Sequence, residues 1–308
     1  MSSGIERIAV VGGGLIGSSM ARLFVENGLK VTIYEPDKAA RGRLDQTMRG
    51  WALGSRVPAI HAELEAALCG AQFVLEAAPE RLPLKQALLK EMEIFLAKDV
   101  VIATATSSLL VSDMQVGMVH PNRLVAAHPF NPPHLIPLIE VAGSESTSEE
   151  ALATTYGLFK AIGRRPVRLK REAIGHIANR LTSALYQEAV HIVSSGIASV
   201  ADVDDAVRYG PGIRWAVMGP HMLYHLGAGE GGYAKYLKHL GPTQEARWAS
   251  LGKPRLDDST RQMLIDGVNQ EAAGRDIEQL CADRDQGLLA ILQALAALNN
   301  EPLNEGIQ

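Results

Sequence analysis

The segment Ile8-Ala9-Val10-Val11-Gly12-Gly13-Gly14-Leu15-Ile16-Gly17 decides the fold of this chain. Residues 5–11 predict a buried strand, residues 12–17 a tight turn and residues 18–26 a helix. The turn matches G-x-G-x-x-G: Gly12 permits the turn, Gly14 lets a pyrophosphate approach the backbone, and Gly17 allows close helix packing. The helix N-terminus adds partial positive charge. A dinucleotide site that includes Leu15 and Ile16 is therefore predicted here. The alternative is a tight turn that binds nothing.

An acidic residue ends the next predicted strand, residues 30–35. Its position along the chain fits the dinucleotide motif, in which such a carboxylate accepts hydrogen bonds from the ribose hydroxyls. Glu35 would also repel a 2'-phosphate, which favours NAD over NADP as the cofactor. Lys38, Arg41 and Arg43 follow closely and weaken this preference.

The pattern of the chain changes near Arg171. Before it, short apolar runs at 73–76, 100–104 and 124–127 alternate with helical segments, which predicts an α/β fold: a Rossmann-type, doubly wound, mostly parallel sheet. After it, apolar residues recur every three or four positions, which predicts an all-α C-terminal domain. We expect two domains, residues 1–171 and 172–308.

Composition restricts the partners of the protein. The 308 residues are 47% hydrophobic and 21% charged, with a formal net charge of -4, which favours a small molecule over nucleic acid or an anionic membrane. Cys69 and Cys281 have no metal-like spacing, and no metal or disulfide is expected. The N-terminus lacks the pattern of a signal peptide, and the longest apolar tract, 288–298, is too short to span a bilayer. We expect a cytoplasmic protein.

An apolar, proline-rich run over residues 126–141 holds His128 and Glu140. Residues 135–139 look like a buried strand that ends at Glu140. A buried carboxylate needs a partner, and a paired imidazole and carboxylate make a general base with its own orienting group. A structural ion pair is the alternative.

The Thr106-Ser107-Ser108 turn follows a predicted strand, where ligands of open α/β sheets bind, although serine also caps helices. Asn179 lies early in a predicted helix, and its amide needs a polar partner.

In their order along the chain, these motifs resemble those of the L-3-hydroxyacyl-CoA dehydrogenase superfamily over essentially the whole length. The resemblance implies an NAD-dependent dehydrogenase in which His128 is the catalytic base, Glu140 its partner, Ser107 a hydrogen-bond donor to substrate and nicotinamide, and Asn179 a positioner of substrate. It also implies that the helical domain binds substrate and forms a homodimer. Further contacts on the cofactor side are implied for Ala78, Glu80, Lys85 and Asn131.

Two differences from the acyl-CoA enzymes restrict the range of possible substrates. The stretch from Glu35 to Ala62 is shorter than the helical hairpin that contributes to coenzyme A binding in that family. An insertion brings Arg214 and Trp215 before Met-Gly-Pro, which is similar to the L-carnitine dehydrogenase branch and, less closely, to L-gulonate 3-dehydrogenase and lambda-crystallin. Arg214 is suited to a free carboxylate, with a structural ion pair as the alternative.

The predicted reaction is oxidation of the 3-hydroxyl of a small free 3-hydroxy carboxylic acid, with L-carnitine, giving 3-dehydrocarnitine, as the favoured substrate. A trimethylammonium group favours aromatic faces and a carboxylate, although aromatic residues at helical spacing also build cores. The alternatives are L-gulonate, another hydroxy acid, a hydroxyacyl-CoA, and a crystallin-like structural or NAD-binding protein. Candidates around the substrate are Trp215, Phe130, Tyr186, Tyr224, Tyr233, Glu188 and Glu230.

Overall fold

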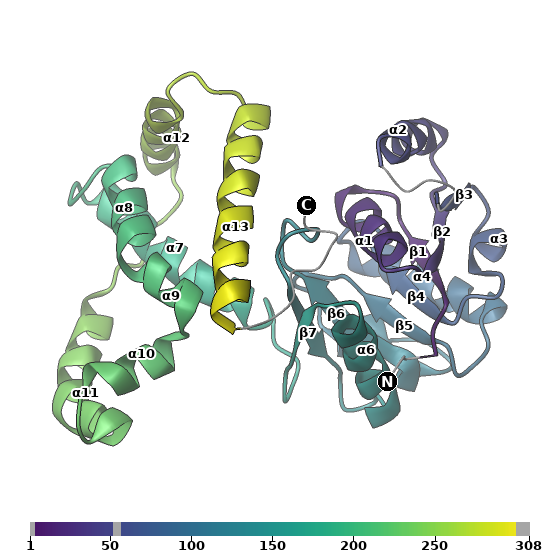
Figure 1. Cartoon of the computed structure of the whole chain (residues 1–308), viewed down its shortest axis with the longest axis horizontal. Helices are drawn as coiled ribbons and strands as arrows, with labels where there is room; N and C mark the ends of the chain where they lie inside the picture. Colours follow the sequence, from purple (N-terminus) through teal and green to yellow (C-terminus); the bar gives the residue numbers. More distant parts are fainter. Residues whose placement is uncertain (1–3, 52–56, 300–308) are drawn as a thin grey trace. The chain divides into compact units, whose positions relative to one another are not determined.

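The computed structural model describes residues 4–51 and 57–299. It divides into two compact units, which meet in sequence between Arg180 and Leu181. This division falls inside helix α7 (Ala178–Ser194), whereas the boundary predicted near Arg171 falls in the loop before that helix. The first unit is built on a sheet and the second is helical (Figure 1).

An eight-stranded sheet forms the centre of the first unit, in the order β3-β2-β1-β4-β5-β6-β7-β8. Strands β1 to β6 are parallel, β7 is antiparallel to β6, and β8 is parallel to β7. The predicted mostly parallel sheet is thus confirmed. The strands are β1 (Arg7–Val11), β2 (Lys30–Tyr34), β3 (Ala59–His61), β4 (Phe73–Glu76), β5 (Val101–Thr104), β6 (Leu124–Pro129), β7 (Leu138–Ala142) and β8 (Arg165–Arg168).

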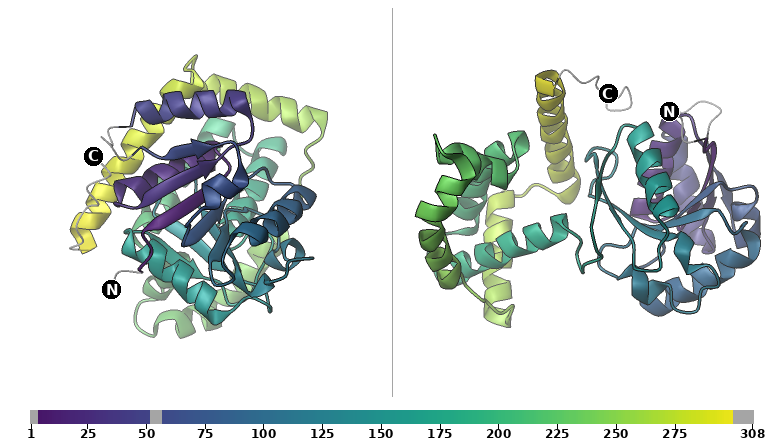
Figure 2. Two further views of the ribbon diagram at one scale, coloured as in Figure 1. Left: turned by 90° about the vertical axis from the view of Figure 1, so that its right-hand side faces the viewer. Right: turned by 90° about the horizontal axis from the view of Figure 1, so that it is seen from below.

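Helices cover both faces of this sheet, which makes the fold doubly wound (Figure 2). Ile8 and Val10 of β1 point to one face, and Ala9 and Val11 point to the other, as alternation along a strand requires. The first face packs against α1 (Leu15–Glu26), α2 (Lys38–Arg49) and α6 (Glu149–Ala161). The second packs against α3 (Leu64–Leu68), α4 (Leu82–Phe95) and α5 (Val111–Met114), and the short turn η1 (Pro121–Arg123) precedes β6.

The glycine turn joins β1 to α1 by a close backbone approach. A Cβ at Gly17 would lie 1.9 Å from the carbonyl oxygen of Gly12, so only glycine fits there. Gly12 itself has φ 110°, in the region that favours glycine. Helix α1 begins at Leu15, within the motif, and not at Ser18 as predicted, because Gly14 already adopts the extended conformation of an N-cap. The low helix propensity of glycine hid this earlier start.

Strand β7 begins later than the sequence predicts. The apolar run from Leu135 was expected to be a strand that ends at Glu140, but the N–H groups of Leu135 and Ile136 both donate to the carbonyl of Pro132 in a turn. The strand therefore starts at Leu138, and Glu140 lies in its middle. In the antiparallel register Glu140 is directly opposite His128 of β6.

The second unit consists of helices, as predicted. Its hydrophobic core is small: among its described hydrophobic side chains, only Val190, Val193, Val200, Val203 and Tyr236 are buried. Within the described part of the chain, no helix combines the length and the apolar character that crossing a bilayer requires. The elements that follow α7 are α8 (Val200–Val207), η2 (Arg208–Gly212), α9 (Ile213–Val217), α10 (Pro220–Gly227), α11 (Gly232–Ser250), α12 (Asp258–Ala272) and α13 (Ile277–Asn299).

Candidate active site

A pocket of about 260 Å³ lies beside the glycine turn, with Gly13, Gly14 and Glu35 in its wall. The backbone N–H of Gly13 donates to Oε2 of Glu35 at 3.0 Å, and the N–H of Asp37 donates to Oε1 at 3.0 Å. These bonds fix the carboxylate at the end of β2, next to the turn. The position matches the one that a ribose-binding carboxylate takes in this motif.

The turn also suits a pyrophosphate. Nothing lies within 4 Å of the place where a Cβ of Gly14 would stand, so the backbone there is open to close approach. Gly14 is the N-cap of α1, and no side chain caps this helix, whose first turn begins with Leu15. Its N-terminal N–H groups are therefore available for phosphate oxygens. The residues present fit a dinucleotide.

A second pocket, of about 430 Å³, contains most of the predicted site residues of the first unit. Parallel strands end at the same edge of the sheet, and the residues that follow β1, β4, β5 and β6 therefore come together. The sequence did not single out Ala77, Ala105 or Pro129, which carry no signal beyond their place at a strand end. The lining residues are Ile16, Ala77, Ala78, Glu80, Lys85, Ala105, Ser107, His128, Pro129, Phe130, Asn131 and Asn179.

His128 and Glu140 form a buried pair behind this pocket. The distance from Nδ1 of His128 to Oε2 of Glu140 is 3.0 Å, and Glu140 is 1% exposed. The other carboxylate oxygen, Oε1, accepts hydrogen bonds from the N–H groups of Ile177 at 2.8 Å and Ala178 at 2.9 Å. Both oxygens of a charge that burial alone would make costly are thus satisfied.

These bonds decide the protonation of the pair. Burial alone would raise the pKa of Glu140, but the hydrogen bond with His128 and the N–H groups of Ala178 and Ile177 outweigh it and lower that pKa. Because the carboxylate is ionised and can only accept, Nδ1 of His128 carries the proton and donates. The lone pair of the neutral ring is then on Nε2, and His128 lines the pocket.

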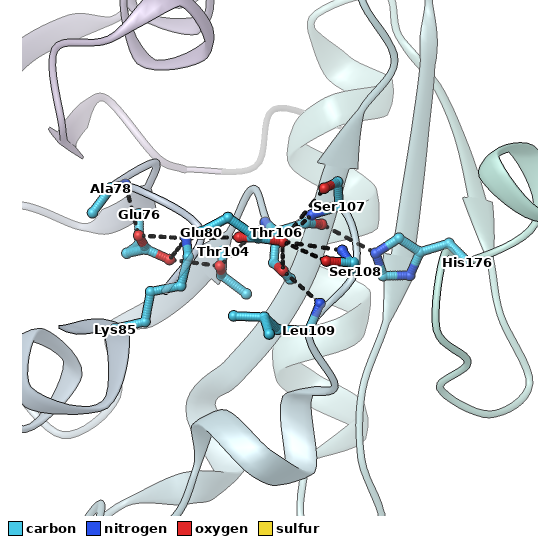
Figure 3. A network of polar contacts seen from close by, with 10 residues as sticks. All are labelled: Glu76, Ala78, Glu80, Lys85, Thr104, Thr106, Ser107, Ser108, Leu109 and His176. Carbon is cyan, nitrogen blue, oxygen red and sulfur yellow. Dashed lines mark hydrogen bonds and ion pairs between the residues drawn. The ribbon is translucent and has the colours of Figure 1, made fainter. Parts of the chain in front are cut away.

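A second carboxylate organises the turn after β5 (Figure 3). Oε1 of Glu80 accepts hydrogen bonds from the Thr106 hydroxyl at 2.6 Å and from the N–H groups of Ser107 at 2.9 Å and Ser108 at 3.1 Å. Burial alone would raise the pKa of Glu80, but the Thr106 hydroxyl, the charge of Lys85 and these N–H groups lower it. The alternative that the serines cap a helix is wrong, because the N-cap of α5 is Leu110.

Lys85 reaches this network from α4. Its Nζ atom lies 2.8 Å and 2.9 Å from the two carboxylate oxygens of Glu76, and it is also 3.5 Å from Oε2 of Glu80. The Thr104 hydroxyl donates to Glu76 at 2.6 Å. Lys85 lines the pocket, yet it is only 1% exposed and neutralises two carboxylates. The sequence indicated Lys85 and Glu80 but not Glu76 as the partner that holds them.

The beginning of α7 connects to the same turn. The side-chain amide of Asn179 donates to the Ser107 carbonyl at 3.3 Å, which provides the polar partner that the sequence required. Asn179 also lines the pocket. Just before it, Nε2 of His176 lies 3.1 Å from the Thr106 carbonyl. Nothing in the sequence indicated that His176 would lie beside the predicted base.

The remaining substrate candidates lie in the second unit. Arg214 and Trp215 are exposed on α9, and Arg214 makes no ion pair with any residue that the structure describes. On α7, Tyr186 is exposed, while Oε2 of Glu188 accepts a hydrogen bond from the Gly252 N–H at 2.8 Å. Among the residues that the structure describes, no hydrogen bond or ion pair joins any two of these side chains.

Tyr224 and Tyr233 do not form a cage with each other. Both rings stack on Tyr236, with centroids at 4.6 Å and 5.8 Å, so each tyrosine uses one face inside a stack. The Tyr233 hydroxyl is 3.0 Å from Nδ1 of His221.

Residues 4–51 and 57–299 contain no group of three or more His, Cys, Asp or Glu side chains arranged to hold a metal ion.

Comparison with known proteins places the chain. Residues 7–173 match the NAD binding domain of 3-hydroxyacyl-CoA dehydrogenase, and residues 175–274 match its C-terminal domain. The chain belongs to the 3-hydroxyacyl-CoA dehydrogenase family. It is therefore an NAD-dependent oxidoreductase, as the motifs predicted, and the fit of the glycine turn to a dinucleotide agrees with this cofactor.

Similar proteins carry more specific names. L-carnitine dehydrogenase of Streptomyces coelicolor is 40% identical over 308 residues, which cover 96% of this chain and 97% of that protein. L-carnitine dehydrogenase of Oceanobacillus iheyensis is 35% identical over 299 residues, which cover 94% and 97%. These identities confirm the predicted resemblance to the L-carnitine dehydrogenase branch.

Two solved structures share the fold and a comparable level of sequence identity. One is 5-formyl-3-hydroxy-2-methylpyridine 4-carboxylic acid 5-dehydrogenase, an NAD+ dependent dismutase, with a TM-score of 0.80 and 26% identity over 97% of this chain and 100% of that one. The other is 3-hydroxybutyryl-CoA dehydrogenase of Escherichia coli K12, with a TM-score of 0.64 and 25% identity over 85% of this chain and 57% of that one.

The lowered pKa of Glu140 makes a prediction about stability. A carboxyl whose folded pKa lies below its unfolded value stabilises the fold above the unfolded pKa, and this contribution is lost as the pH falls through the folded pKa. We expect Glu140→Gln to lower the free energy of unfolding by about 3 kcal/mol at pH 7, because a buried partner is lost. The difference from wild type should shrink below about pH 4, where the unfolded carboxyl is protonated. Urea denaturation across this pH range measures it.

Glu150→Gln is the matched control, because Glu150 is an exposed residue of α6. Its stability should follow that of the wild type at every pH. A Glu140→Gln deficit that is the same at pH 7 and at acid pH would contradict an ionised, stabilising Glu140.

Proposed function

We propose that the protein oxidises the 3-hydroxyl of a small free 3-hydroxy carboxylic acid, and that this substrate is L-carnitine, which becomes 3-dehydrocarnitine. The observation that carries the proposal is the similarity to L-carnitine dehydrogenases along nearly the full length of both chains. The His128–Glu140 pair beside the second pocket supports it, because oxidation of an alcohol requires a group that accepts the hydroxyl proton.

The proton step follows from the hydrogen bonds of His128. Nε2 holds the lone pair, so it accepts the proton of the substrate hydroxyl, and the ring becomes an imidazolium. Glu140 then faces a full positive charge across the 3.0 Å contact and stabilises it. Because Glu140 is fixed by two backbone N–H groups, no reorganisation is needed during the transfer. NAD, when bound, supplies the acceptor for the hydride that leaves C3, the carbon that bears this hydroxyl.

Two polar side chains of the pocket are suited to hold the substrate. Ser107 and Asn179 both line the pocket with His128, and the amide of Asn179 bonds to the Ser107 backbone. We assign Ser107 a hydrogen bond to the reacting oxygen and Asn179 a positioning contact. Phe130 provides an apolar wall. Their mutual contacts keep them in place before the substrate arrives, which is the basis of catalysis by orientation.

The cofactor side of the site follows from the two pockets. The pyrophosphate is assigned to the backbone of Gly12, Gly14 and Gly17 and to the start of α1, and the ribose to Glu35. Glu80 and Lys85 bond mainly to other protein groups, so their proposed role is to hold the pocket wall. Contacts with the remainder of the cofactor are proposed for Leu15, Ile16, Ala78, Ser107 and Asn131.

Substrate identity depends on groups other than the base. Arg214 is suited to bind a free carboxylate. Its guanidinium is exposed, and it makes no ion pair with the residues that the structure describes. For the trimethylammonium group we propose Trp215, Tyr186 and Glu188 of the second unit. A single helix, α2, occupies the described part of the stretch where the acyl-CoA enzymes carry a hairpin, which favours a free acid over a thioester.

We further propose that the protein is a homodimer formed through the second unit. Few hydrophobic side chains are buried in that unit, and many large ones are exposed, including Tyr209 at 64%, Trp248 at 61% and Ile277 at 76%. So much exposed apolar surface is unusual for a monomer and typical of an interface. A second copy of the chain is the occupant we infer, because closed homodimers are the commonest assembly of such enzymes.

A cytoplasmic location is proposed on two grounds. Both cysteines, Cys69 and Cys281, are free thiols, which suits a reducing compartment. An NAD-dependent oxidoreductase also needs a supply of this dinucleotide.

The first test compares substrates and variants through NADH formation. We expect turnover with L-carnitine and little or none with L-gulonate, 3-hydroxybutyrate or 3-hydroxybutyryl-CoA. His128→Ala should lower kcat at least about a hundredfold, the usual scale for a general base, while NAD binding is retained. His120→Asn is the control, because His120 lies before β6, at the end of the strand opposite His128. Near-normal turnover of His128→Ala would refute the assigned base, and activity with another substrate alone would refute carnitine.

A second test concerns Arg214. Removal of a bidentate, charge-assisted contact should raise the KM for L-carnitine at least about tenfold in Arg214→Met, with the KM for NAD unchanged. The amide of L-carnitine lacks the carboxylate and should be processed equally by both enzymes. Arg261→Met, on the exposed face of α12, is the control. An unchanged KM for L-carnitine would place the carboxylate elsewhere.

The third test is the mass of the protein in solution. Sedimentation equilibrium at micromolar concentration should give twice the mass of the 33.1 kDa chain. A mass of one chain at that concentration would contradict the proposed homodimer.

A further inference from the structure

His176 lies against the predicted base without touching the pocket. Its ring stacks on the ring of His128, with centroids 5.1 Å apart and planes inclined by 28°. The side chain is 3% exposed, and it does not line the pocket. Figure 3 shows the ring pointing at the turn that holds Thr106 and Ser107. His176 is therefore in contact with the reacting group and shielded from the substrate.

The hydrogen bonds of His176 define its tautomer. Nε2 is 3.1 Å from the Thr106 carbonyl oxygen, and a carbonyl can only accept, so Nε2 carries the proton. Nδ1 is buried and has no hydrogen-bond partner among the residues that the structure describes. A proton added to Nδ1 would have no acceptor, and the ring would then carry a charge in a buried place.

The charges around the ring act in opposite directions. Burial lowers the pKa of His176 most, and the neighbouring His128 of β6 lowers it further. The Thr106 carbonyl, Glu140 of β7 and Glu80 after β4 act to raise it, but the net direction is downward. The lowered pKa favours the neutral form of the ring, in agreement with the unpartnered, buried Nδ1.

The backbone at His176 has an uncommon conformation. Gly175 has φ 75° and His176 has φ 50°, both in the left-handed region. Histidine is one of the few residues besides glycine that is enriched there. This turn directs the next two N–H groups, of Ile177 and Ala178, to the carboxylate of Glu140. One turn thus places a ring on His128 and also fixes the partner of His128.

We propose that His176 is a positioning residue for the proton transfer, whose neutral ring holds the imidazole of His128 in the orientation that directs Nε2 to the substrate. Glu140 holds one edge of the His128 ring at Nδ1, and the stacked ring of His176 covers one of its faces. Together these contacts prevent the imidazole from turning. Because it stays neutral, it does not repel the imidazolium that forms when His128 takes the proton, as a second cation would. This inference rests on the proposed role of His128 as the base.

Two substitutions separate the ring from the hydrogen bond. His176→Asn tolerates the left-handed backbone but lacks a ring to stack, and its short amide does not reach the Thr106 carbonyl that Nε2 of histidine contacts. His176→Phe retains the ring but has no donor. We expect kcat to fall about tenfold to a hundredfold in His176→Asn, the scale of a misplaced catalytic group, and to change less than about threefold in His176→Phe. The KM for NAD should be unchanged in both, and His120→Asn is again the control.

The pH profile of kcat and the NMR signal of His176 test whether its ring is neutral, as the proposal requires. Since His176 is neutral in the wild type, the acid limb of kcat should lie at the same pH in His176→Phe. In the wild type, ¹⁵N NMR of the imidazoles should show His176 as the neutral Nε2–H tautomer between about pH 5 and 8. This measurement needs no variant, so it tests the proposal even where a variant does not fold.

Each outcome decides the proposal. Wild-type kcat in His176→Asn, a loss in His176→Phe as large as in His176→Asn, or a His176 signal that titrates near pH 6.5 would each overturn it. If His128→Ala is inactive while His176→Asn is fully active, only this inference fails. If His128→Ala retains turnover, the proposed base fails instead.

Discussion

The buried carboxylate of Glu140 is the constraint on which the site depends. A charge that is 1% exposed is costly unless both oxygens are satisfied, and here two distant segments satisfy them. One oxygen faces His128 across the β6–β7 pair, and the other accepts the N–H groups of Ile177 and Ala178 at the start of α7. The antiparallel β7, the end of the parallel sheet and the first turn of α7 are therefore fixed by a single ion, and the same ion gives His128 its tautomer.

The same principle builds the other wall of the pocket. Glu76 and Glu80 flank the end of β4, and Lys85 from α4 lies between them. Glu80 then uses its remaining capacity to order the turn that presents Ser107. Each acid is satisfied by segments at the pocket, so the groups that stabilise this edge of the sheet also place the proposed catalytic groups. Preorganisation here is a consequence of buried charges that require partners.

The sequence predicted the features that depend on residues close together in the chain. The glycine turn, the alternation of strands and helices, and the need of Glu140 for a partner are all readable within short segments. What the sequence missed depends on contacts between separate elements: His176 meets the Thr106 carbonyl across 70 positions, and Lys85 of α4 meets Glu76 at the end of β4. The predicted start of β7 was wrong because the N–H groups of Leu135 and Ile136 bond to Pro132 in a turn and do not pair with a neighbouring strand. Apolar character indicates burial, but it does not indicate which hydrogen bonds a backbone makes.

The reaction and the choice of substrate require different kinds of group. A base that accepts a proton from a secondary alcohol acts in the same way on a carnitine, a gulonate or a hydroxyacyl thioester, because each presents a hydroxyl to the base, for which we propose His128. Discrimination must therefore come from the part of the substrate that does not react: a carboxylate and a quaternary ammonium in one case, a thioester in another. Charge decides between these, since a guanidinium such as Arg214 gains much from a carboxylate and little from a thioester.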